Sequence, residues 1–164
     1  MLALLLGISI FLINATNKII MCSAFFTLSL FITNIITESY SKKKAISVLT
    51  FCVLVNAALA WQKFNVMLVI YFASLLFSFY CSVNLLERLK PQLNFSIRNY
   101  ISSIISVLID VGILTVVHLL IGQFPLYNVI TIGAKSLIYK VLYTSIISFA
   151  VSISSKMSRQ EVKA

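Results

Sequence analysis

The chain contains little charge, and very little of that charge is acidic. Of 164 residues, 10% are charged and four are Asp or Glu, whereas 60% are hydrophobic and the mean hydropathy is +1.04. Soluble domains carry roughly 25% charged residues. The sequence also lacks a long polar stretch, which argues against a separate soluble domain. The composition therefore predicts an integral membrane protein.

The groups on which most enzymes and metal proteins depend are also scarce. His118 is the single histidine, and the sequence has no Gly-rich phosphate loop, H-E-x-x-H or G-x-S-x-G motif. Cys22, Cys52 and Cys81 lie within apolar segments, are odd in number and show no C-x-x-C spacing. Disulfide frameworks and zinc sites need paired or clustered cysteines. We therefore expect no enzyme activity, no cofactor and no metal site.

The hydrophobic residues are grouped in six apolar segments. They span residues 2–16, 19–37, 45–62, 64–86, 100–121 and 127–154. Because crossing a bilayer takes about 20 apolar residues in a helix, these segments predict an all-α bundle of six transmembrane helices. They form one domain over residues 1–155, followed by a cytoplasmic tail at 156–164.

The first segment is short for a membrane span. As a helix it reaches only ~26 Å against a hydrocarbon core of ~30 Å, so it either tilts inward or belongs to a longer segment that begins upstream. A cleaved signal peptide is the alternative. It is disfavoured because no basic region precedes the apolar run and no clear small-residue cleavage site follows it.

The basic residues predict the orientation of the chain. Two of them, Lys18 and Lys63, fall on one side of the membrane and nine fall on the other. The nine are Lys42, Lys43, Lys44, Arg88, Lys90, Arg98, Lys156, Arg159 and Lys163. Since cytoplasmic loops are enriched in Lys and Arg, both termini are expected in the cytoplasm, with the protein in the cell inner membrane. The net charge of +9 then reflects topology, so the lipid bilayer is an expected partner and nucleic acid is not.

Polar residues recur at helical spacing in four of the segments. Such faces turn toward other helices or a cavity rather than toward lipid. The stripes consist of Ser23, Thr27, Asn34 and Glu38; Tyr71, Ser74, Ser78 and Ser82; Ser103, Ser106 and Asp110; and Ser136, Lys140, Thr144, Ser148 and Ser152. For the Ser and Thr residues alone, close helix packing is favoured over contact with a solute.

Asp110 and Lys140 change that balance. A charge at mid-membrane costs at least ~2.5 to 3.5 kcal/mol, so it needs a partner, a water-filled cavity or a function. Asp110 lies fifteen residues before Pro125 and Lys140 fifteen residues after it, so two antiparallel helices bring them to similar depth. Two interpretations stay open: a structural ion pair between the last two helices, or a pair that lines a binding cavity. The stripes on other helices favour the cavity.

The remaining candidates are less distinctive. Glu38 lies four residues before Lys42 at the end of its segment, where a solvated interfacial carboxylate is the simplest explanation. Aromatic rings can stack on a planar solute, although in membrane helices they more often pack or anchor the helix. The tyrosines in question are Tyr71, Tyr80, Tyr139 and Tyr143. The six residues selected as a substrate-binding site are Asn34, Glu38, Ser78, Ser106, Asp110 and Lys140.

Residues 34–45, NIITESYSKKKA, resemble the D-x-[IL]-T-E-x-Y-G-x-x-x-A signature of the queuosine precursor transporter family, also called the vitamin uptake transporter family. Residues 86–90, LERLK, resemble the basic connector of that family, and residues 98–110 resemble its R-N-x-x-S-T-x6-D stretch. Lys140 falls where the last helix of the family carries a lysine. The positions that depart from the family pattern are Asn34 for Asp, Ser41 for Gly, Ser78 and Phe79 for Gly-Gln, Ser82 for Asp, and Val107 for Gln.

The resemblance implies a transporter that imports a 7-deazaguanine such as preQ0, preQ1 or queuine, or a similar small planar solute. A carboxylate such as that of Asp110 can accept the adjacent N–H donors of a guanine-like edge. Two alternatives stay open: a substrate-binding subunit of a multi-component vitamin importer, which needs an energising partner, and a diverged structural membrane protein that transports nothing. The sequence also leaves open proton coupling and self-association into a homo-oligomer.

Overall fold

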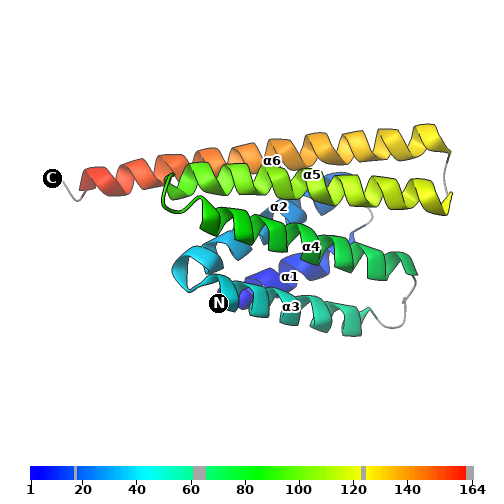
Figure 1. Cartoon of the computed structure of the whole chain (residues 1–164), viewed down its shortest axis with the longest axis horizontal. Coiled ribbons are helices and arrows are strands. Elements are labelled where there is room, and N and C mark those ends of the chain that lie inside the picture. The colour runs from blue at the N-terminus through cyan, green and yellow to red at the C-terminus, as the bar shows by residue number, and fades with distance from the viewer. Residues whose placement is uncertain (17, 61–65, 123–124, 162–164) are drawn as a thin grey trace.

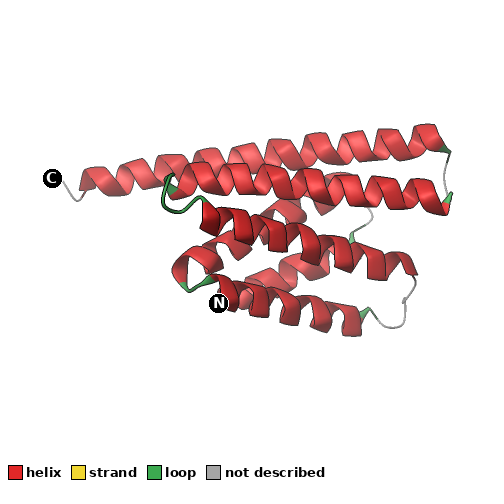
Figure 2. Ribbon diagram, viewed as in Figure 1, coloured by secondary structure: helices red, strands yellow, loops and turns green. Residues whose placement is uncertain are grey.

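In the computed structural model, the described residues are 1–16, 18–60, 66–122 and 125–161, without the side chains of residues 14 and 154–161. These residues form six α-helices and no strand, which confirms the all-α prediction (Figures 1 and 2). The helices are α1 (Leu2–Ala15), α2 (Ile19–Ser39), α3 (Lys42–Leu59), α4 (Val66–Arg88), α5 (Phe95–Ile121) and α6 (Leu126–Glu161).

At three helix ends the helix extends three or more residues beyond the predicted apolar segment, because polar residues continue the helix there. Helix α3 begins at Lys42, and its N-cap Ser41 accepts a hydrogen bond on its side chain from the backbone N–H of Lys44 at 3.4 Å. Helix α5 begins at Phe95 rather than at residue 100, so Arg98 is helical although it precedes the predicted apolar segment. Helix α6 continues to Glu161, through part of the predicted tail.

Two of the basic residues used for the orientation, Lys63 and Lys163, lie outside the described residues. The predicted end of the third segment, residues 61–62, and the predicted start of the fourth, residues 64–65, lie outside them as well. Helix α5 ends as predicted at Ile121. Gly122 follows in the left-handed region at φ 68°, a conformation that glycine adopts without a Cβ penalty, and its N–H bonds to the carbonyl oxygen of His118 at 3.3 Å.

Four of the helices are long and apolar enough to span a membrane: α2, α4, α5 and the part of α6 that ends at Ile153. Helix α1 has 14 residues, about 21 Å of helix, and α3 carries three lysines in its first turn. The membrane character of the chain thus rests on four helices within the described residues. Complete crossings by α1 and α3 stay a prediction.

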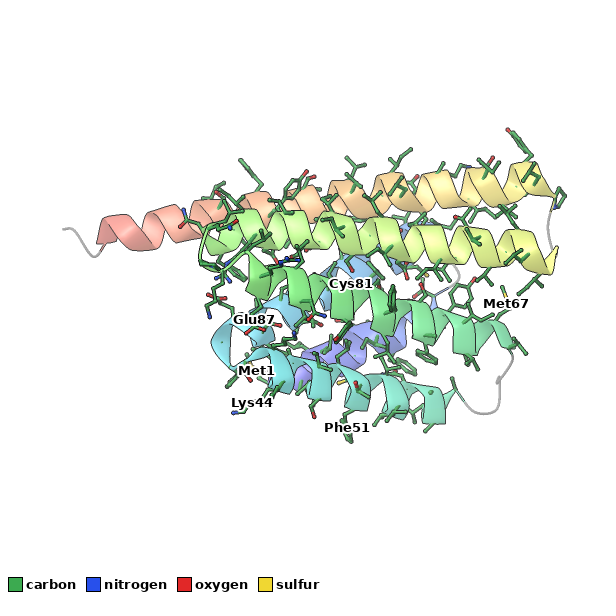
Figure 3. The ribbon with its side chains drawn as sticks, in the orientation of Figure 1. Met1, Lys44, Phe51, Met67, Cys81 and Glu87 are labelled. Atoms are coloured by element: carbon green, nitrogen blue, oxygen red, sulfur yellow. The ribbon has the colours of Figure 1, made fainter. Side chains whose placement is uncertain are left out.

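Helix α2 occupies the centre of the bundle, since it packs against each of the other five helices. Helices α5 and α6 run side by side as a long antiparallel hairpin, with α4 packed against the other side of α5 (Figure 1). The connections from α2 to α3 and from α4 to α5 lie at one end, which we call the basic end; it carries Lys42–Lys44, Arg88 and Lys90. Figure 3 places Met1, Lys44 and Glu87 there together.

The distribution of side chains is the reverse of that in a soluble bundle. Large apolar side chains face outward on every helix, for example Phe51 at 68% exposed and Phe149 at 70%. Inside, buried polar side chains are as common among the described residues as buried apolar ones. Apolar residues fill the side of the bundle near α1 and α3, including Leu6 and Leu49. The polar residues gather where the four long helices meet, and there the candidate site lies.

Candidate functional site

Asp110 of α5 and Lys140 of α6 form an ion pair in the bundle interior. The Nζ of Lys140 lies 2.6 Å from Oδ2 of Asp110, and their side chains are 7% and 4% exposed, respectively. The other carboxylate oxygen, Oδ1, accepts a hydrogen bond from the hydroxyl of Ser74 on α4 at 2.8 Å. Equal spacing from Pro125 predicted that Asp110 and Lys140 lie at similar depth, and in the structure their side chains are in contact. Both carboxylate oxygens are occupied by donors from neighbouring helices.

Aromatic rings complete the surroundings of this pair. The Nζ of Lys140 lies 4.0 Å from the ring centroid of Phe26 on α2, a cation–π contact. Phe26 packs edge to face on Phe79 of α4, with centroids 5.1 Å apart. Both rings are buried, whereas Tyr71 and Tyr80 are 40% and 47% exposed. The aromatic surface beside the charges thus comes from phenylalanines, which carry no polar signal that distinguishes them from other apolar residues.

Asn34 of α2 links three helices at a level about two helical turns closer to the basic end than the ion pair. Its Nδ2 donates to Oδ1 of Asn99 at 2.9 Å and lies 3.3 Å from the hydroxyl of Ser103, both on α5. Its Oδ1 accepts from the hydroxyl of Ser82 on α4 at 3.2 Å. The side chain of Asn34 is fully buried. Its amide is therefore satisfied by Ser82 and Ser103, which belong to separate stripes in the sequence, and by Asn99, which belongs to none.

Between these two clusters, Ser106 of α5 donates to the backbone carbonyl of Ser78 on α4 at 2.9 Å. The hydroxyl of Ser78 in turn donates to the carbonyl oxygen of Leu75 in its own helix at 3.1 Å. Both serines are fully buried. This contact joins helix backbones closely, which is the ordinary structural use of small hydroxyl residues in membrane helices.

Glu38 lies apart from the central pair, at the basic end. Its Oε1 accepts from Nη2 of Arg98 at 2.6 Å, and its side chain is 34% exposed while that of Arg98 is 5% exposed. Nη1 of Arg98 lies 3.5 Å from the carbonyl oxygen of Leu86. A merely solvated carboxylate is therefore the wrong description of Glu38. It forms an ion pair with a buried arginine that precedes the predicted apolar segment 100–121.

At the other end of the contact between α4 and α5, far from the basic end, Tyr71 of α4 lies against His118 of α5. The Tyr71 hydroxyl lies 3.1 Å from Nε2 of His118, and Nδ1 of His118 lies 2.7 Å from the carbonyl oxygen of Leu114. A carbonyl only accepts, so Nδ1 carries the proton and, in the neutral ring, Nε2 accepts from the tyrosine. Polar contacts thus follow α5 from Arg98 to His118.

Helix α6 is attached to this network differently. Its buried polar side chains among the described residues are Lys140, Thr144 and Ser148, and of these Lys140 has its partner on another helix. The hydroxyl oxygens of Thr144 and Ser148 have no hydrogen-bond partner. Leaving a buried hydroxyl unsatisfied costs about 1–3 kcal/mol. Helices α2, α4 and α5 are thus joined by several hydrogen bonds. Helix α6 packs extensively against α5 and α2, and among its buried polar side chains Lys140 is the one bonded to another helix.

The six selected residues therefore fall into three groups. Asp110 and Lys140 form the central pair, Ser78 and Ser106 share a contact next to it, and Asn34 and Glu38 belong to clusters nearer the basic end. All but Glu38 are buried.

Comparisons of the chain with models of protein families, with curated proteins and with solved structures found no match.

Proposed function

We propose that the protein is an inner-membrane carrier that imports a 7-deazaguanine such as preQ0, preQ1 or queuine, or a similar small planar solute, with both termini in the cytoplasm. One observation carries the proposal: a buried acid–base pair, flanked by buried aromatic rings, lies where the four long apolar helices meet. The motifs at residues 34–45 and 98–110 support the choice of solute. Ionisable groups at membrane depth usually mark a solute or ion pathway.

The chemistry of the pair suits a guanine-like edge. Such an edge presents N–H donors beside a carbonyl oxygen. A bound solute can direct its donors to Asp110, replacing those of Ser74 and Lys140, while its carbonyl accepts from the freed ammonium of Lys140. The carboxylate then remains satisfied throughout, which avoids the cost of an unpaired buried charge. The flat ring finds an aromatic surface in Phe26.

Exchange of the pair also supplies a reason for movement. Since Lys140 carries the buried ion pair between α5 and α6, its transfer from Asp110 to the solute removes that link and leaves the two helices held by packing. The other three long helices stay joined by the contacts of Asn34 and Ser106. In this mechanism the solute binds near the middle of the membrane and leaves toward the basic end as α6 shifts.

Uptake of labelled preQ1 and queuine tests the proposal, in cells that lack both their own synthesis and their own transporter. We expect accumulation with the wild-type protein and none with Asp110→Asn, after normalising to folded protein in the membrane. Glu87→Gln is the matched control, because Glu87 is an exposed carboxylate of α4 and its variant should retain uptake. Wild-type uptake in Asp110→Asn would remove Asp110 from the mechanism.

A structural role without transport is the second candidate, and it has its own support. Every hydrogen-bonding atom of the Asp110 carboxylate and the Asn34 amide is already matched to a protein partner. Satisfied polar clusters of this kind are what helix association alone requires. Failure of the well-expressed wild type to accumulate any offered deazapurine or vitamin would favour this role over the carrier.

A further inference from the structure

Four buried hydroxyls among the described residues have no hydrogen-bond partner: Ser23 and Ser29 of α2, and Thr144 and Ser148 of α6. Of these, Thr144 and Ser148 lie on the same helix as Lys140. They are 4% and 9% exposed, and neither oxygen has a hydrogen-bond partner. Other hydroxyls avoid this by bonding to the preceding turn of their own helix: Thr33 donates to the carbonyl of Ser29 at 2.8 Å, and Ser145 to that of Val141 at 2.9 Å. Thr144 and Ser148 thus retain hydrogen-bonding capacity that the protein itself does not use.

Their position ties them to the central pair. They follow Lys140 by four and eight residues, so all three lie on one face of α6, about 6 Å and 12 Å along the helix axis from the lysine. Within the described residues α6 packs against α2 and α5, so this face is the one buried between those two helices. The hydroxyls lie on the side of Lys140 that leads to the basic end.

We propose that Thr144 and Ser148 bind a hydroxylated substituent of the solute whose flat ring occupies the Asp110–Lys140 pair. The inference rests on the proposed function and narrows it: the preferred solute is a guanine-like base that carries a polar, hydroxyl-bearing group, as queuine does, rather than the bare base. A hydroxyl group both donates and accepts, so it can satisfy two protein hydroxyls in sequence. The spacing of about 6 to 12 Å from Lys140 matches a group that extends beyond the ring.

The same arrangement explains why these positions are polar at all. Valine and alanine would fill them without leaving a hydroxyl unsatisfied in the empty protein. A hydroxyl that the fold does not use is understandable where a ligand uses it. A site that hydrogen-bonds a hydroxyl of its ligand discriminates against analogues without that hydroxyl, because such analogues leave the protein atoms unpaired.

The test compares two ligands on purified protein in lipid nanodiscs, by calorimetric titration. The ligands are queuine, which carries a hydroxylated ring substituent, and 7-deazaguanine, which carries none. Wild-type protein should bind queuine more tightly. Thr144→Val and Ser148→Ala should each weaken queuine binding about three- to tenfold and leave binding of 7-deazaguanine unchanged, because each removes one hydrogen bond to the substituent.

Matched variants separate this explanation from a general effect on α6. Ser145→Ala removes a hydroxyl that is bonded within its own helix, and it should change neither affinity. Thr144→Ser retains the hydroxyl and should retain most of the queuine affinity. Thermal unfolding without ligand gives a second measurement: Thr144→Val should be at least as stable as the wild type.

The outcomes are distinct. Three results for Thr144→Val would overturn the subsite and leave the carrier proposal standing. They are an equal loss of affinity for both ligands, no loss of affinity for either ligand, and a marked fall in the unfolding temperature of the empty protein. Wild-type protein that binds neither ligand would overturn the proposed function, and the subsite with it.

Discussion

Removing one partner of the Asp110–Lys140 pair should destabilise the protein far more than removing both. Lys140→Met leaves a carboxylate with one remaining donor, the hydroxyl of Ser74, in an interior where its side chain is 4% exposed. Exposed ion pairs contribute about 0–1 kcal/mol, whereas breaking a buried pair costs about 3–5 kcal/mol. The 2.6 Å distance and the low exposure of both side chains place this pair in the second class. We therefore expect Lys140→Met to lower the free energy of unfolding by about 3–5 kcal/mol.

The double variant Asp110→Leu/Lys140→Met removes both charges, so no unpaired charge remains buried. Replacing a buried pair with apolar side chains of similar size is often neutral or stabilising in soluble proteins. Its free energy of unfolding should therefore return to within about 1–2 kcal/mol of the wild type, allowing for the lost hydrogen bond from Ser74. The coupling between the two positions is then at least about 2 kcal/mol.

Unfolding by a denaturing detergent in mixed micelles measures these differences, with helix content followed by circular dichroism. Lys135→Met is the matched control, because it removes an exposed lysine from the same helix and should change the free energy of unfolding by less than about 1 kcal/mol. Two single variants whose losses simply add in the double variant would refute the reasoning, since additivity is the behaviour of residues that do not interact.

Two further variants test the packing of the bundle. Gly133→Ala would bring a Cβ to within 2.7 Å of the Thr115 hydroxyl, so we expect it to lower the unfolding temperature and the second substitution Thr115→Ala to restore that temperature. Gly112→Ala is the control: no atom lies within 4 Å of its new Cβ, so it should be neutral or stabilising by up to about 1 kcal/mol. Asn34→Leu leaves the hydroxyl of Ser82, and the partners of Asn34 on α5, without the hydrogen bonds of the Asn34 amide. We expect the free energy of unfolding to fall by about 2 kcal/mol or more in the same assay, and an unchanged value would show that this network contributes nothing to stability.

The long apolar helices were predictable because bilayer thickness imposes a length on any apolar run that crosses it. Their polar ends were not, since hydropathy falls before the helix stops. Arg98 shows the consequence: it precedes the predicted apolar segment, yet it lies in α5 and pairs with Glu38 across the bundle. A hydropathy pattern does not reveal a partner sixty residues away.

The candidate site divides in the same way. The depth of Asp110 and Lys140 followed from their equal distance to Pro125, because two antiparallel helices share the same rise per residue. That their faces meet depends on helix rotation, which is set by the packing of α5 against α4 and α6. The contributions of Phe26 and Phe79 depend on packing in the same way, since an apolar residue in an apolar segment carries no positional signal of its own.

The sequence by itself therefore determined the helical fold, the presence of helices apolar enough to span a membrane, and the similar level of Asp110 and Lys140 along their helices, since these follow from composition, segment length and rise per residue. Only the tertiary structure decided which side chains touch. It placed the Asp110–Lys140 pair against Phe26, linked Asn34 to α4 and α5, and left the hydroxyls of Thr144 and Ser148 without partners. The physical reason is that hydrogen bonds and ion pairs act over a few ångströms, and such distances are fixed by the rotation and packing of helices that are far apart in the chain.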